Sequence, residues 1–158
     1  MSEFAGITER RLKSRPITNV IQRGMVNIQL AFAHFEEDFE RVVGEGGLST
    51  SGFNVLRILR GHPEGHPRGE IAKRLVYRRS DVTRVIDVLV RRGLVERTRH
   101  AGDRRLSLAR ITPKGLKTLA RLDAKLDVLI AEYDKKMSRR EWGELSRLLE
   151  AVYAAHVD

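Results

Sequence analysis

Polar side chains that could pair with base edges share one face of the segment from Arg79 to Arg92. Apolar residues between Val82 and Leu89 recur every three or four positions, which predicts a helix with an inward apolar face. The outward face combines hydrogen-bond donors and acceptors, and an arginine there can pair bidentately with a guanine. We predict base-reading roles for five residues of this face: Arg79, Ser80, Asp81, Thr83 and Arg84.

The positive charge of the chain is concentrated around this helix. From Arg68 to Arg110 there are 13 Lys and Arg against 5 Asp and Glu, which leaves +8 of the chain's total of +9. A basic surface that served solubility alone would be spread along the sequence, so this segment indicates a site for a polyanion. Three side chains beside the outward face suit phosphates, which position a protein on DNA without specifying sequence: Lys73, Arg78 and Arg91.

A second basic probe follows the helix. Leu94–Thr98 and Leu106–Ile111 have the pattern of two short strands, and His100–Asp103 predicts the turn between them. A thin basic hairpin beside a recognition helix can reach the adjacent minor groove. We expect Asp103 to orient Arg105 through a salt bridge. The predicted wing contacts are Arg99, Asp103, Arg104 and Arg105.

The elements that position these probes follow from periodicity and breaks. A helix begins at Ser49 and runs to about Arg60, and Gly61–Pro67 predicts a turn. A short helix from about Gly69 to Val76 then precedes the base-reading helix, which is the layout of a helix-turn-helix. We predict a mainly α fold with a small β-hairpin, in which residues 48–112 form a winged helix-turn-helix DNA-binding domain.

Long amphipathic helices flank this domain. Apolar stripes in steps of three and four run from Met25 to Val42, from Leu116 to Met137 and from Trp142 to Val152. These stripes exceed what a small central domain can cover, so we predict burial against a second copy in a homodimer. Residues 17–47 and 113–158 would be dimerisation helices, and residues 1–16 a flexible basic N-terminal arm.

Two of the flanking helices have local start signals. Thr112 is placed as an N-cap with Pro113 at the first helical position. Ser138 and Glu141 have the spacing of a capping box. Both signals predict helix starts independently of the apolar stripes.

Composition excludes several classes of protein. The 158-residue chain is 41% hydrophobic, enough for a core, and contains no cysteine for a disulfide or a zinc site. It has neither the apolar run of a signal peptide nor one that could cross a bilayer. We therefore expect a soluble, cytoplasmic protein without a membrane partner.

Other polar residues have simple interpretations. His62 and His66 have a spacing found in some metal sites, but each precedes a proline and Glu64 is the only acid nearby, so we favour a plain turn without metal. We interpret Asp81 and Asp87 as base-selecting or Arg-orienting groups rather than a catalytic pair. The sequence offers no nucleophile–base set and no phosphate-binding glycine loop, so we expect neither an enzyme nor a cofactor.

From about Ile17 to His156 the chain resembles the MarR family of bacterial transcription regulators. The similarity lies in the helix opening at Leu48–Leu56, in the recognition helix and strand entry at Arg79–Arg97, and in the wing and its exit at Asp103–Gly115. The last segment contains an Asp-x-Arg wing motif and is the most specific. The chain departs from the family pattern at three places: Val76, Arg78 and His66–Pro67.

The resemblance implies a dimer that binds a pseudo-palindromic operator in double-stranded DNA. It also implies release by a small, often aromatic, ligand that enters a cleft between the dimer helices and the winged domain. His34 is either an ordinary helix-face residue or part of such an effector pocket with Phe35 and Phe53. We expect a homodimeric, sequence-specific transcriptional regulator, a ligand-released repressor. The alternative is a non-specific architectural DNA-binding protein without an effector.

Overall fold

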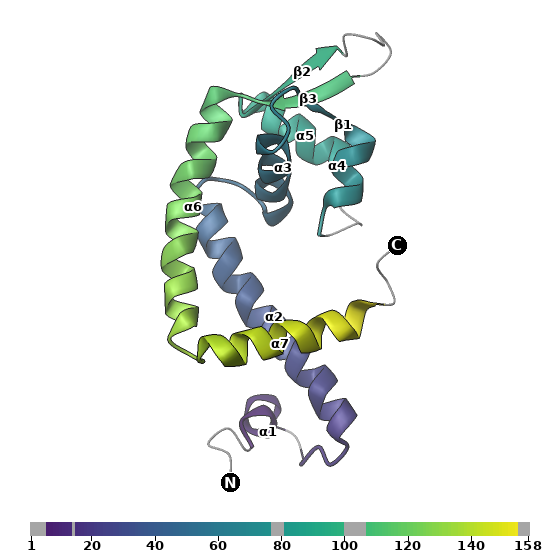
Figure 1. The fold of residues 1–158 in the computed structure, drawn as a ribbon, viewed down its shortest axis with the longest axis vertical. Helices are drawn as coiled ribbons and strands as arrows, with labels where there is room; N and C mark the ends of the chain where they lie inside the picture. The colour runs from purple at the N-terminus through teal and green to yellow at the C-terminus, as the bar shows by residue number, and fades with distance from the viewer. Residues whose placement is uncertain (1–5, 14, 77–80, 100–106, 155–158) are drawn as a thin grey trace. The chain divides into compact units, whose positions relative to one another are not determined.

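The computed structural model of the chain describes residues 6–13, 15–76, 81–99 and 107–154. It divides into two compact units, Met1–Arg41 and Val42–Asp158, which are described separately below. The expected fold class, mainly α with a small β-hairpin, is confirmed (Figure 1). None of the helices described is long and apolar enough to cross a membrane.

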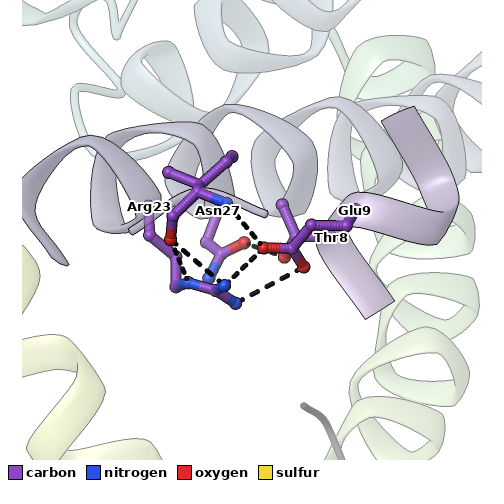
Figure 2. A network of polar contacts seen from close by, with 5 residues as sticks. Thr8, Glu9, Arg23 and Asn27 are labelled. Carbon is purple, nitrogen blue, oxygen red and sulfur yellow. Dashed lines mark hydrogen bonds and ion pairs between the residues drawn. The ribbon is translucent and has the colours of Figure 1, made fainter. Parts of the chain in front are cut away.

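The first unit contains α1 (Ile7–Leu12) and most of α2 (Val20–Gly44). The sequence predicts a loose arm over residues 1–16, which is wrong for residues 7–12. The Glu9 carboxylate pairs with the Arg23 guanidinium and accepts a hydrogen bond from the Ile17 N–H at 3.2 Å (Figure 2). The buried Thr8 hydroxyl lies 2.6 Å from Asn27 Oδ1 on α2. The contacts with Arg23 and Asn27, 14 and 19 residues apart in sequence, fasten α1 to α2.

The second unit follows in sequence as α3, β1, α4, α5, β2, β3, α6 and α7. Helices α3 (Thr50–Arg60), α4 (Arg68–Arg74) and α5 (Val82–Arg91) lie beside the sheet (Figure 1). Strands β2 (Val95–Arg99) and β3 (Ser107–Ile111) form the predicted hairpin. The two C-terminal helices are α6 (Pro113–Asp134) and α7 (Arg139–Tyr153).

The turn predicted over Gly61–Pro67 is only partly correct. Its last two residues form β1 (His66–Pro67), which pairs antiparallel with β3 through His66–Ala109 and Pro67–Leu108. The sheet order is β1-β3-β2, so β1 is an edge strand, where proline is tolerated because it need not donate to a second neighbour. This pairing joins the chain before α4 to the wing.

Local capping signals hold in the structure. Ser49 Oγ accepts from the Gly52 N–H at 3.1 Å, and Thr112 Oγ1 accepts from the Gly115 N–H at 3.0 Å. Ser138 and Glu141 form the predicted capping box. These caps satisfy backbone donors that the first turn of a helix leaves without partners.

The core of the second unit is built from α3, α5, α6 and the sheet. Its fully enclosed side chains include Phe53 and Leu56 on α3, Leu89 on α5, and Leu119 and Leu122 on α6. Apolar faces of α3, α5 and α6 are therefore buried in this core, whereas no residue of α7 is buried. This core fixes α5 and the β2–β3 hairpin relative to each other. Helix α3 contacts both α5 and β3, and α5 also contacts β2 directly.

Candidate nucleic-acid interface

Helix α5 begins at Val82, three residues later than the sequence analysis expects. Asp81 is its N-cap: one carboxylate oxygen accepts a hydrogen bond from the Arg84 N–H at 3.2 Å. The structure thus shows a capping role for Asp81 that the sequence analysis missed, although Asp81 is also an exposed residue. Its base-reading role stays a prediction.

The outward face of α5 has the arrangement that its periodicity predicts. Val82, Ile86 and Leu89 are buried, whereas Arg84 is exposed and Thr83 half-buried. Arg91, proposed for a phosphate, is also exposed. Three of the predicted contact residues lie outside the described part of the chain: Arg78, Arg79 and Ser80.

Arg68 is a residue of this surface that the sequence analysis did not single out. It is the first residue of α4, and its Nη1 donates to Thr83 Oγ1 on α5 at 2.8 Å. The two residues share a groove of about 390 Å³ between α4, α5 and the sheet, together with Arg97 and Ser107. Arg68 is the first residue of the basic segment Arg68–Arg110. Its place in that segment is the sequence feature that could have identified it.

The hairpin is joined to the recognition helix by an ion pair. Asp87 on α5 accepts from the Arg97 guanidinium on β2. Of the two roles that the sequence suggests for Asp87, base-selecting or Arg-orienting, this ion pair corresponds to the second. Arg99 lies at the end of β2, and the other predicted wing contacts lie outside the described residues: Asp103, Arg104 and Arg105.

Lys73, predicted to contact a phosphate, has a partner on its own helix. Its Nζ donates to Glu70 Oε1 at 2.8 Å. This hydrogen bond and the Lys73 charge lower the pKa of Glu70, with a smaller contribution from Arg74. A phosphate contact from Lys73 would therefore have to compete with a carboxylate, and it stays a prediction.

The two histidines of the turn stack on each other, with ring centroids 4.0 Å apart and planes at 11°. His62 contacts Arg74 through Nε2, and the buried Nε2 of His66 has no hydrogen-bond partner. Burial is the main cause that lowers the pKa of His66, and the charges of His62 and Arg74 add to it. Within the described ranges, no group of three or more possible ligands is placed to hold a metal ion.

The predicted effector residues have unequal exposure. In the first unit, His34 is exposed with its Nδ1 3.8 Å from Glu37, and the Phe35 ring stacks on Phe39 at 5.8 Å. In the second unit, Phe53 is fully buried. Phe53 is therefore a core residue in this structure.

The comparisons with known proteins agree with this geometry. Residues 47–106 match the model of the MarR family. A putative transcriptional regulatory protein for the hcr operon of Thauera aromatica is 25% identical over 121 residues, which cover 77% of this chain and 72% of that protein. The HTH-type transcriptional regulator PrsX of Escherichia coli is 27% identical over 125 residues, 78% of this chain and 74% of that protein.

A solved structure extends the likeness in fold. The organohalide-sensing transcriptional regulator RdhR, in its 2,4-dichlorophenol-bound form, superposes with a TM-score of 0.77 at 19% identity, covering 89% of this chain and 86% of that one. Both curated relatives are transcriptional regulators by name. The winged-helix segment of the chain, residues 47–106, therefore matches the MarR family, and about three quarters of the chain is similar to transcriptional regulators.

Proposed function

We propose that the protein is a homodimeric repressor that binds a pseudo-palindromic operator and is released by a small, aromatic ligand. The observation that carries the DNA-reading part is the link between α5 and the hairpin. Arg84 is exposed on α5, and one turn later Asp87 holds Arg97 of β2. Recognition helix and wing therefore act as one rigid reading head, with Arg84 for a base and the wing for the neighbouring groove.

The dimer is supported by apolar surface that the chain exposes on its flanking helices. On α2, Val20, Ile21 and Met25 are all more than 60% exposed. None of the residues of α7, Arg139–Tyr153, is buried, and Val152 is 64% exposed. Apolar surface on this scale marks an interface, and a second copy of the chain is the simplest partner. Two-fold symmetry would then require a pseudo-palindromic site.

Release by a small ligand is supported only by the similarity of this chain to a regulator solved with a ligand bound. RdhR has been solved with 2,4-dichlorophenol, and a ligand acts on such a regulator when it binds one spacing of the two reading heads better than another. His34 and Phe35 on α2 remain the predicted contacts. The function as a regulator of transcription would place the protein in the cytoplasm, where bacterial DNA lies.

Fluorescence anisotropy with the DNA upstream of the protein's own gene and with random DNA tests the proposal. We expect binding to the upstream site to be at least about 10³-fold tighter, as for specific regulators. Equal affinity with a steep salt dependence would reject the operator and favour the non-specific architectural binder. Adding 2,4-dichlorophenol in the same assay tests release.

A further inference from the structure

A groove on the second unit lies between α3 and the end of α4 and is not used by the proposed reading head. It has a volume of about 640 Å³, within the range of small-molecule sites. One side of the groove is formed by residues spaced three or four apart along α3 and by the glycine that caps it: Asn54, Arg57, Ile58 and Gly61. The rest of the lining comes from Arg60, Arg74 and Val76. A methyl group added at Gly61 would meet only the Ile58 carbonyl oxygen, at 3.5 Å, so this part of the groove is open.

The lining carries three arginines and no carboxylate. Arg60 is neutralised from outside the groove by Asp123 on α6. In the part of the chain that the structure describes, neither Arg57 nor Arg74 forms an ion pair with a carboxylate. Arg57 has its guanidinium carbon 6.0 Å from the centre of the Phe53 ring, and Arg74 contacts the Nε2 atom of His62. Two guanidinium groups are thus left for an anion.

The groove also has an apolar part. Val76 is 74% exposed, and Ile58 lines the same groove half-buried. Asn54, one turn before Arg57 on α3, adds a neutral amide that can donate or accept. The lining therefore offers a charged end for an acid and an apolar surface for a hydrocarbon body.

We infer that this groove binds an organic anion, a carboxylate or phosphate attached to an apolar body. Arg57 and Arg74 bind the acid group, because guanidinium forks match the two oxygens of a carboxylate or phosphate. Val76 and Ile58 contact the apolar body. This site lies wholly within the second unit and shares no residue with the predicted effector pocket of His34, Phe35 and Phe53.

The position of Arg74 gives the anion a route to the reading head. Arg74 ends α4, the first helix of the helix-turn-helix, and contacts His62. His62 stacks on His66 of β1, which pairs with β3 of the wing. An anion that draws Arg74 away from His62 would change the contacts at the end of α4 and those of the histidine stack beside β1. This regulatory step rests on the proposed function, whereas anion binding itself does not.

Calorimetric titration of the full chain at constant ionic strength tests the binding. The probes are benzoate and phenyl phosphate, with benzamide as the neutral analogue of benzoate. We expect both anions to bind and benzamide to bind at least about tenfold more weakly, since it lacks the charge that both arginines recognise. Equal affinity for benzoate and benzamide would overturn the proposal.

Matched variants locate the site. Arg57→Gln and Arg74→Gln should each weaken benzoate binding by about tenfold or more. Arg121→Gln removes the same charge from an exposed position of α6 outside the groove and should bind benzoate as the wild type does. Circular dichroism melts verify that each variant folds, and Arg57→Lys should retain part of the affinity. Equal binding by all the variants would place the anion elsewhere.

DNA binding distinguishes this site from a phosphate contact and from the proposed function. Without anion, Arg57→Gln should bind the upstream DNA as tightly as the wild type, and a loss of DNA affinity would show that the groove holds a DNA phosphate instead. With anion, the DNA affinity of the wild type should change and that of Arg57→Gln should not. A wild type that binds benzoate at Arg57 but prefers no DNA sequence would reject the repressor and leave the anion site standing.

Discussion

Asp87 on α5 and Arg97 on β2 form an ion pair that joins the recognition helix to the wing strand. The two residues are ten positions apart, and the chain between them makes the turn from helix into hairpin. Their side chains are 40% and 52% exposed, so solvent screens much of the attraction. The pair therefore matters less for stability than for the angle between two elements that contact DNA.

Breaking this pair should affect DNA binding more than folding. Asp87→Asn should lower the free energy of unfolding by less than about 1 kcal/mol, as for other exposed pairs. The affinity for operator DNA should fall further, because the wing is no longer held beside α5. Urea unfolding and anisotropy measure the two quantities. Glu144→Gln, which breaks the Arg147 pair on α7, is the control and should leave DNA affinity unchanged.

The base-reading role of Arg84 is tested by replacement with alanine. Arg84→Ala should cost on the order of 1–3 kcal/mol of binding and relax the preference at one base position. Arg91→Ala is the matched comparison: loss of a phosphate contact should weaken binding to all sequences alike and reduce the salt slope by about 1. A binding-site selection experiment compares the two variants, and an unaltered preference in Arg84→Ala would exclude base reading.

Gly115 allows the start of α6 to lie close to Leu94, the residue just before β2. A Cβ at this position would lie 2.3 Å from the Leu94 carbonyl oxygen and 2.8 Å from Ile111 Cγ1. Since one of these atoms belongs to the backbone, the α6 start or the strand must shift, and Gly115→Ala should destabilise by about 1–3 kcal/mol. Gly143 in α7 has open space around it, so Gly143→Ala should stabilise by up to about 1 kcal/mol. Destabilisation of similar size by both would argue against the close approach.

Acid should destabilise the second unit through His66. Its pKa is lowered by burial, and further by His62 and Arg74, whereas Glu70 and Glu64 oppose the shift. The unfolded chain takes up this proton near pH 6.5 and the folded chain only at lower pH, so stability should fall as the pH drops below about 6.5. The pKa values of Glu9, Glu141 and Glu144 are also lowered. These carboxylates change the stability only below about pH 4.5, outside the range in which His66 titrates.

The measurement is the urea midpoint at pH 7.5, 6.5 and 5.5. His66→Phe keeps an aromatic ring for stacking and removes the titrating group, so it should flatten the fall in stability. His34→Gln, which removes an exposed histidine of α2, should keep the slope of the wild type. If His66→Phe loses stability with acid as steeply as the wild type, another group is responsible.

The proposed dimer is tested on α2. Met25→Glu places a charge within the exposed apolar stripe and should convert the dimer to monomers, because an unpaired charge is costly at a buried interface. Ala33→Glu adds the same charge at an exposed position of this helix that points away from the stripe, and it should leave the dimer intact. Sedimentation velocity distinguishes the two states. A wild type that sediments as a monomer at micromolar concentration would reject the proposal outright.

Sequence alone determined the features that depend on near neighbours. The caps at Ser49, Thr112 and Ser138 were predictable because each side chain accepts from a backbone N–H three residues later. The inward face of α5 was predictable because helical periodicity selects Val82, Ile86 and Leu89 whatever they pack against. The charge count likewise placed the predicted DNA interface between Arg68 and Arg110 without any coordinates.

Only the tertiary structure decided which distant residues meet. Glu9 with Arg23, Arg68 with Thr83, and Asp87 with Arg97 are 10 to 15 residues apart, and each pairing depends on how two elements approach. His66–Pro67 became a strand because β3 offered an edge, and Phe53 became core because α3 turned it inward. Local spacing records the periodicity of one element, but the contacts between elements follow from packing the whole chain at once, which no short stretch of sequence contains.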